Sequence, residues 1–287
     1  MTPLRVVIAG YATLDYVVQS EEDFHGTGTV LSALGISEAW PRAGGAALYA
    51  SRRVAAAGHQ SFALTWIGDD ADGGHYLRAC QRSNICCEAI SQTQGATTPR
   101  CILIYGPSGD YGCLLDVGQT DCERLSEQQV KAVKAANHVC FTAGPAQASN
   151  ELLDLLPEGA SVSWIAKRDT QSFPHDLCKR LAGVADIIFC NASEREFIES
   201  AFVGSRKQGQ LLIETLGSAG VLIDSGEGQE IIPAHAVRAQ DTTGAGDTLA
   251  GEVIAGYLTG QMTIREAVQN GMTAARSLIL SRTKPQT

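Results

Sequence analysis

Asp241-Thr242-Thr243-Gly244-Ala245-Gly246-Asp247 is the most informative stretch of the chain, and a helix-like run, Thr248–Leu258, follows it directly. Small residues let a backbone approach a ligand closely and expose its N–H groups. A helix that begins at such a turn adds unpaired amides and the positive end of its dipole. The stretch therefore predicts a site for an anionic oxygen, for which a phosphate is the best candidate.

Asp247, the last residue of this stretch, indicates the chemistry. A carboxylate does not bind phosphate, but it suits a proton acceptor or a ligand of metal-bound water. Beside an anion site it suggests phosphoryl transfer to a hydroxyl, in which positioning and charge stabilisation do most of the catalysis. On spacing alone, a tight strand-to-helix connection with an aspartate N-cap explains the stretch equally well. The pattern matches neither the P-loop nor G-x-G-x-x-G.

The composition limits the class of protein. The chain has 287 residues, enough for one large α/β domain or one domain with a small appendage. The net charge of −9 argues against binding to nucleic acid or to an anionic membrane. No apolar run approaches the length of a membrane span. The segment Leu4–Gly10 is too short for the apolar part of a signal peptide and reads as a first strand.

The cysteines favour a cytoplasmic protein. There are nine: Cys80, Cys86, Cys87, Cys101, Cys113, Cys122, Cys140, Cys178 and Cys190. Their number is odd, no C-x-x-C pair occurs, and most lie in apolar stretches. We interpret them as buried, reduced thiols rather than disulfides or zinc ligands.

Strand-like apolar runs alternate with amphipathic, helix-like stretches. The strand-like runs are Arg5–Ala9, Ser61–Ile67, Val139–Thr142, Ser161–Ile165, Ile187–Cys190 and Leu211–Thr215, and the helix-like stretches include Ala46–Ala57, Gly74–Ser83, Glu127–Ala136 and Asn150–Leu155. This alternation predicts an α/β fold with a central, mainly parallel, doubly wound sheet flanked by helices. Ligands of such sheets bind at the carboxyl ends of the strands. The turn that begins at Asp241 is a fair candidate for that edge.

Two regions break this alternation. Tyr11–Trp40 contains Gly26, Gly28 and Gly35, and Thr97–Val117 reads as two strands around a Gly106–Asp110 turn. We expect them to form a small separate β-layer, a lid of about residues 11–41 and 97–118 within a single domain of residues 1–287. A lid that excludes water would serve phosphoryl transfer. The alternative is an ordinary hairpin that extends the main sheet.

Five motifs, in order along nearly the whole chain, resemble those of the PfkB/ribokinase family of carbohydrate kinases. They are Gly10–Asp15; Ala43–Ala47 with Gly58, Ile67–Asp70 and Gly73; Asn191–Glu194; Thr215–Gly220; and Asp241–Asp247. Each motif alone is weak, and their order makes the resemblance specific. It implies a ribokinase-like fold and ATP-dependent phosphorylation of a small-molecule hydroxyl, most simply that of a sugar.

The resemblance also implies catalytic roles. Asp247 would be the general base that takes the proton from the attacking hydroxyl. The amides of Gly244, Ala245 and Gly246 would form the anion hole for the transferring phosphoryl group. This division is chemically sound, because a carboxylate beside backbone donors can deprotonate without competing for the phosphate.

Nucleotide and metal residues follow from the same resemblance. The implied ATP contacts are Asn191, Thr215, Gly217, Gly220, Thr242, Asn270 and Lys167, with Asn270 near the adenine. Asn191 and Glu194 would organise Mg²⁺ through water, since Mg²⁺ keeps much of its hydration shell. Taken alone, these two residues fit a helix N-cap with a capping-box glutamate, and Lys167 fits a solvated lysine.

The resemblance also implies a site for the acceptor substrate. Its residues would be Thr13, Asp15, Gly44, Gly45 and Tyr49, together with Asp247. A carboxylate can accept two sugar hydroxyls, and glycines let the backbone do the same. Taken alone, Asp15 is a strand-end cap and Gly44-Gly45 a turn.

Several positions depart from the family pattern. Many relatives have asparagine where this chain has Thr13 and Tyr49. The Tyr49 ring either stacks on the base of a nucleoside or packs into the core. Glu252 replaces a small residue, and Ala166–Asp169 replaces a usual D-P-N. Leu280–Lys284 lacks the glycine-containing loop that helps form a monovalent-cation site in many relatives.

These departures leave three functions open. They are a sugar kinase, a nucleoside kinase of the same fold, and a non-catalytic protein that binds nucleotide or sugar. The intact Asp247 and the complete Gly244–Gly246 turn argue against loss of catalysis. A homodimer through the lid is suggested by the resemblance only.

Overall fold

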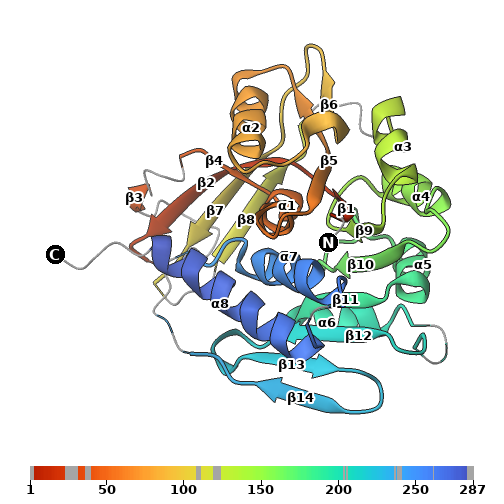
Figure 1. Ribbon diagram of the computed structural model, residues 1–287. Coiled ribbons are helices and arrows are strands. Elements are labelled where there is room, and N and C mark those ends of the chain that lie inside the picture. Colours follow the sequence, from red (N-terminus) through yellow and green to blue (C-terminus); the bar gives the residue numbers. More distant parts are fainter. Residues whose placement is uncertain are drawn as a thin grey trace.

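A computed structural model provides the coordinates. It describes residues 3–22, 32–35, 40–107, 111–118, 124–202, 204, 206–235, 237, 241–260 and 262–282. These residues form a nine-stranded sheet flanked by helices and a five-stranded sheet beside it (Figure 1). The predicted α/β fold with a second, smaller β-layer is confirmed.

The nine-stranded central sheet is mainly parallel. In spatial order its strands are β14 (Gln229–Ile232), β13 (Val221–Asp224), β12 (Leu211–Thr215), β11 (Ile187–Asn191), β10 (Ser161–Ile165), β9 (His138–Phe141), β1 (Arg5–Ala9), β5 (Gln60–Gly68) and β6 (Ile90–Thr93). Only β13 and β14 run antiparallel to their neighbours. Because the parallel strands are buried on both faces, they read as the continuous apolar runs that predicted them.

Helices cover both faces of this sheet. On one face lie α1 (Ala46–Ala56), α7 (Ala245–Tyr257) and α8 (Ile264–Arg282); on the other lie α3 (Glu127–Lys134), α4 (Ala146–Asp154), α5 (His175–Val184) and α6 (Ala192–Glu199). Each layer has its own apolar core, one around Trp164 and Phe141 and the other around Val253 and Ile254. α2 (Ala71–Arg82) packs against β5 in a third core.

The order in which strands are added to the sheet changes sides at β1. β5 pairs with one side of β1 and the later β9 with the other, both parallel. A crevice forms outside the carboxyl ends of strands at such a switch point. Gly10, directly after β1, has no room for a side chain, since a Cβ there would lie 1.9 Å from Thr142 Oγ1.

The second sheet, called here the small sheet, combines both regions that broke the sequence pattern. It contains β2 (Thr13–Ser20), β3 (Ser32–Gly35), β4 (Arg42–Gly44), β7 (Arg100–Tyr105) and β8 (Tyr111–Asp116). β7 pairs in parallel with β2, and β8 closes the hairpin. The alternative in which this hairpin extends the central sheet is therefore wrong.

The boundaries of the predicted lid are only partly covered. Residues 23–31, 36–39 and 108–110, which include Gly26 and Gly28, lie outside the described residues. The limits 11–41 and 97–118, and the single domain 1–287, stay predictions. Figure 1 shows the C-terminal end of α8 beside the small sheet.

The motif Ile67–Asp70 with Gly73 has a packing role. Asp70 is the N-cap of α2 and accepts a hydrogen bond from the Gly73 N–H at 2.8 Å. A Cβ on Gly73 would lie 2.2 Å from the carbonyl oxygen of Gly68. These residues fasten α2 to the end of β5, which explains the motif without a ligand.

The eight described cysteines are free thiols. Five of them are buried, as predicted, whereas Cys113 on β8 is exposed and lies with its Sγ 3.2 Å from that of Cys101. Cys122 falls outside the described residues. In the part of the chain that the structure describes, no helix is long and apolar enough to cross a membrane.

Candidate active site

A cleft of about 1620 Å³ opens at the carboxyl edge of the central sheet, against the small sheet and the start of α7. It is lined by most of the predicted site residues: Thr13, Asp15, Gly45, Tyr49, Lys167, Asn191, Thr215, Gly217, Gly220, Thr242, Gly244, Ala245, Gly246 and Asp247. Gly44, Glu194 and Asn270 are outside this lining. The fold thus brings together segments that are more than 200 residues apart.

Gly244 is the N-cap of α7 and allows the turn to form. Its φ of +74° lies in the left-handed region, where glycine is strongly favoured. A Cβ at this position would also lie 2.5 Å from the Tyr49 ring. Backbone conformation and packing therefore independently require glycine.

The three amides of the predicted anion hole differ. The Ala245 N–H donates to the carbonyl oxygen of Thr242 at 3.1 Å and so stabilises the turn itself. Within the described ranges, the N–H groups of Gly244 and Gly246 donate no hydrogen bond. Those two donors remain available to an anion at the positive end of the α7 dipole.

Asp247 lies in the first turn of α7, partly buried on the cleft wall. Burial raises the pKa of Asp247, and the positive charge of Lys167 opposes that shift. A carboxylate with a raised pKa is a better proton acceptor near neutral pH. The geometry therefore joins a carboxylate with a raised pKa to two N–H groups without a hydrogen bond within one helical turn.

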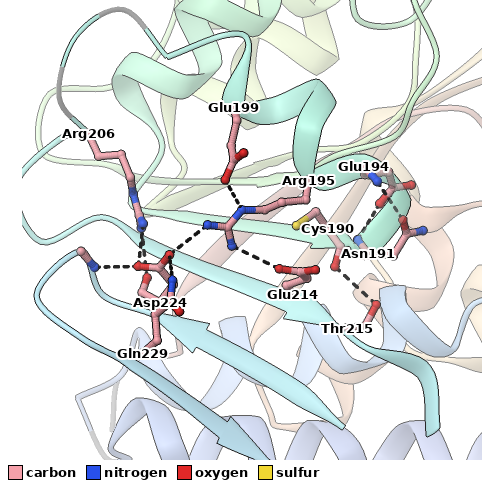
Figure 2. A network of polar contacts seen from close by, with 11 residues as sticks. Cys190, Asn191, Glu194, Arg195, Glu199, Arg206, Glu214, Thr215, Asp224 and Gln229 are labelled. Atoms are coloured by element: carbon pink, nitrogen blue, oxygen red, sulfur yellow. Dashed lines mark hydrogen bonds and ion pairs between the residues drawn. The ribbon is translucent and has the colours of Figure 1, made fainter. Parts of the chain in front are cut away.

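Asn191 and Glu194 form a capping box at the start of α6 (Figure 2). Asn191 Oδ1 accepts from the Glu194 N–H at 3.0 Å, and Glu194 Oε2 accepts from the Asn191 N–H at 2.8 Å. Glu194 Oε1 lies 3.7 Å from Lys167 Nζ. Burial raises the pKa of Glu194, and Lys167 lowers it. The capping-box interpretation is confirmed, and one carboxylate oxygen still faces Lys167.

This pair fits Mg²⁺ only through water. Asn191 Oδ1 also accepts from Ser193 Oγ at 2.7 Å, so it is already occupied. Glu194 Oε1 suits a hydrogen bond to a metal-bound water, because Mg²⁺ usually keeps several waters in proteins. Over the described ranges, no three His, Cys, Asp or Glu side chains are arranged to hold a metal ion directly.

A polar network fixes α6 behind the capping box (Figure 2). Arg195 donates to Glu199 at 2.6 Å and to both Glu214 and Asp224 at 3.1 Å. Arg206 donates to the other oxygen of Asp224 at 2.8 Å. Because these bonds join α6 to β12 and β13, they hold the start of α6 in a fixed place at the cleft.

Asp15 carries a buried carboxylate at the other end of the cleft. Thr13 Oγ1 donates to Asp15 Oδ1 at 2.8 Å, whereas Oδ2 is buried with no hydrogen-bond partner in the described structure. A Cβ on Gly44 would lie 2.0 Å from that Oδ2. Burial raises the pKa of Asp15 to about 6, although the hydrogen bond from Thr13 and the charge of Arg42 both lower it. A buried acceptor without a donor is poised for a ligand hydroxyl.

The structure favours the packing interpretation of Tyr49. Its side chain is almost fully buried, with the ring beneath Gly244. Its hydroxyl accepts from Arg282 Nη2 at 3.0 Å. The ring forms part of the cleft wall, but it supports the turn rather than presenting an open face to a base.

Gly220, in the predicted nucleotide segment, is required by packing. Its φ is +120°, and a Cβ would lie 2.0 Å from the carbonyl oxygen of Ile232. Thr215 Oγ1 donates to the carbonyl oxygen of Cys190 at 3.3 Å (Figure 2). Both residues border the cleft while holding β12 against its neighbours.

Asn270 lies outside the lining of this cleft, and its contact with adenine stays a prediction. It lines a separate hollow beside Arg52 and Glu252, and its Nδ2 donates to Met262 Sδ at 3.3 Å. The residues of the same helix that line the cleft are Gln269, Met272, Thr273, Ala275, Arg276 and Ile279. Glu252, the other departure in this region, pairs with Arg53 at 2.6 Å and so joins α7 to α1.

The sequence analysis missed a buried ionic cluster beneath the turn. Asp241 is shielded from solvent between Arg42, at 2.8 Å, and Arg282, at 3.5 Å. Burial alone would raise the pKa of Asp241. The two guanidinium groups outweigh burial and hold this pKa below its usual value. Arg42 begins β4, directly before the motif Ala43–Ala47, and could have been noticed there. Nothing in the local pattern signals Arg282.

A mainly parallel sheet with a cleft at its carboxyl edge is typical of α/β proteins that bind their ligands at that edge. The family profile described as "pfkB family carbohydrate kinase" matches residues 5–286. The chain belongs to this family, as the sequence motifs indicated.

Similar proteins agree with this assignment. An ATP-dependent ribose-1-phosphate kinase of Halopiger xanaduensis is 27% identical over 203 residues, which are 67% of this chain and 66% of the relative. The match thus spans slightly less than two thirds of that relative.

Solved structures share the fold. The ribokinase of Cryptococcus neoformans var. grubii in complex with ADP superposes with a TM-score of 0.81 at 18% identity, covering 96% of this chain and 94% of that one. A nucleoside kinase of Methanocaldococcus jannaschii gives a TM-score of 0.76 at 18% identity, with 98% and 93% covered.

The buried charge of Asp15 leads to a prediction about stability. Because the folded pKa lies above the unfolded value, ionisation in the folded state weakens stability as the pH rises through about 6. Asp15→Asn should therefore raise the free energy of unfolding by about 1–3 kcal/mol at pH 7.5 and by much less at pH 4.5. Urea unfolding at both pH values measures this difference.

The matched control is Asp69→Asn, because Asp69 is exposed and accepts from the Gly95 N–H, as an asparagine also can. It should change stability by less than about 0.5 kcal/mol at either pH. An equal effect of Asp15→Asn at both pH values would contradict the role given to burial.

Proposed function

We propose that the protein is an ATP-dependent kinase that transfers the γ-phosphate to a hydroxyl of a sugar. The observation that carries this proposal is the pairing of Asp247 with the open amides of Gly244 and Gly246 in one helical turn. The unpartnered Asp15 Oδ2 at the acceptor end of the same cleft adds a group that would bind sugar hydroxyls.

The chemistry follows from these positions. Asp247 accepts the proton of the acceptor hydroxyl, whose oxygen forms a bond to the γ-phosphorus. The bond between that phosphorus and the bridging oxygen breaks, and ADP leaves with the electron pair. The amides of Gly244 and Gly246 hold the charge that spreads over the transferring oxygens.

The nucleotide end is proposed to use Lys167, Thr215 and Thr242 beside the phosphates and base. Lys167 stands between Asp247 and Glu194 and is placed to offset the charge of a polyphosphate. Mg²⁺, when bound, would neutralise phosphate oxygens, and Glu194 would orient its water through Oε1.

A nucleoside acceptor is the second candidate. The face of the small sheet that lines the cleft carries Leu103, Tyr105 and Leu115 in addition to two cysteines. An apolar surface of this kind suits a purine or pyrimidine base better than a free sugar. This observation supports an acceptor that carries a nucleobase, and it does not require the Tyr49 ring to stack on that nucleobase.

The deciding experiment is ADP release with Mg·ATP across sugars, sugar phosphates and nucleosides. Turnover on sugars alone supports the first proposal, and turnover on nucleosides alone supports the second. ATP binding without turnover on any acceptor would instead favour a non-catalytic binding protein.

The proposed base gives a second prediction. Asp247→Asn should lower kcat by roughly 10²–10⁴-fold, the range for the loss of a general base, while ATP still binds. Steady-state kinetics and calorimetric titration with ATP measure the two effects. The control is Asp176→Asn at the exposed start of α5. Near-normal turnover of the Asp247 variant would remove the mechanism.

Glu194 gives a third prediction. Glu194→Gln should raise the Mg²⁺ concentration needed for half-maximal turnover, roughly 10-fold or more, because an orienting anion is lost. A glutamine preserves the capping box, so the change isolates the charge. Glu196→Gln on the exposed side of α6 serves as the control. Identical magnesium titrations for both variants would rule out this role.

The homodimer through the lid is proposed to use the outer face of the small sheet. Ile102 and Leu114 pair directly across β7 and β8, and are 41% and 62% exposed. Leu114→Lys should convert a dimer to a monomer in sedimentation velocity without lowering Tm. Leu280→Lys on α8 should leave the mass unchanged. A monomeric wild-type protein would contradict the proposal.

A further inference from the structure

Arg282, the last residue of α8, reaches back to the turn that carries Asp247. Its side chain is only 9% exposed. Arg282 donates a short hydrogen bond from Nη1 to the carbonyl oxygen of Thr243, and one from Nη2 to the Tyr49 hydroxyl at 3.0 Å. Nη1 also lies 3.5 Å from Asp241 Oδ1. One guanidinium group thus meets three different oxygens beneath the turn.

The contact with Thr243 fixes the direction of an adjacent amide. In a trans peptide, the C=O of one residue and the N–H of the next point to opposite sides. Because Arg282 holds the Thr243 carbonyl, the Gly244 N–H points away from the guanidinium. Gly244 lines the cleft, so this orientation keeps its donor available to a ligand.

Asp247 is the third residue of α7, and the first N–H groups of a helix have no partner within it. The Thr243 carbonyl lies before the helix and accepts from Arg282, and among the described residues none accepts from the Asp247 N–H. The first turn of α7 therefore presents a further open amide beside Gly246.

We propose that Arg282 is a positioning residue for phosphoryl transfer, a built-in cation that holds the Thr243–Gly244 peptide in its anion-binding orientation. Turnover consequently needs no added monovalent cation. This inference rests on the proposed kinase function, but its structural part does not depend on which acceptor is used.

The oxygens around Arg282 suggest how to test the inference. A carbonyl, a carboxylate and a hydroxyl oxygen are the ligands that hard cations prefer. Arg282→Ala would leave these oxygens around an empty space, while Asp241 keeps its ion pair with Arg42 at 2.8 Å. Small cations such as guanidinium or potassium should then bind there. Arg282→Lys keeps the charge but cannot bridge the same oxygens in a planar fork.

The experiment compares wild type, Arg282→Ala, Arg282→Lys and a control, Arg265→Ala. Arg265 lies on the same helix, is half exposed, and pairs with Glu230. Activity on the acceptor found in the panel is measured in tetramethylammonium buffer, then with added guanidinium or potassium chloride. Binding of Mg·ATP and Tm are measured in the same buffers.

We expect wild type and Arg265→Ala to be insensitive to the added cations. Arg282→Ala should lose roughly 10²-fold in kcat, as expected for a misplaced reacting geometry, with a smaller change in the acceptor KM. Guanidinium should restore a part of kcat and raise Tm for this variant only, and Arg282→Lys should be intermediate.

Three results would overturn the inference: wild-type kcat in Arg282→Ala, a loss of kcat that neither cation restores, or activation of wild type by potassium. If no acceptor is turned over at all, the kinase proposal fails separately. In that case a cation-dependent rise of Tm confined to Arg282→Ala still supports the built-in cation, and its absence overturns it.

Discussion

Asp241 carries a carboxylate that is shielded from solvent and lies between two guanidinium groups. Arg42 comes from β4, and Arg282 from the end of α8, so this one charge joins the small sheet, the turn and the C-terminal helix. A buried charge is tolerated only when it is paired and hydrogen-bonded, and removing one partner typically destabilises by about 3–5 kcal/mol. The position of the whole turn depends on this arrangement.

Thr243 shows how completely the turn is held. Its N–H donates to Asp241 at 2.9 Å, its carbonyl accepts from Arg282, and its hydroxyl lies 2.9 Å from that of Tyr105. Tyr105 belongs to β7, so the small sheet touches the turn through a side chain. Donors that are fixed before a ligand arrives need no reorganisation during the reaction. The contact also links the small sheet physically to the proposed anion site.

The sequence predicted those features that depend on local pattern. The strand Arg5–Ala9 matches its predicted limits, because a strand that is buried on both faces must be apolar throughout. The capping box of Asn191 and Glu194 was also predictable, because it depends on two residues only three positions apart. Contacts between distant residues were not predictable: Arg282 and Tyr49 are separated by 233 positions, and no periodicity links them.

Tyr49 illustrates the limit of pattern and its consequence for specificity. The sequence left open whether its ring stacks on a base or packs, and in the structure its burial beneath Gly244 and its bond to Arg282 favour packing. A ring that supports the anion turn cannot at the same time be withdrawn to accommodate different acceptors. In the proposed kinase, selection of the acceptor would then fall to Asp15, whose Oδ2 has no partner among the described residues, and to the apolar face of the small sheet. A carboxylate at one end of the cleft and an apolar sheet face beside it favour an acceptor that has both a polar and an apolar part.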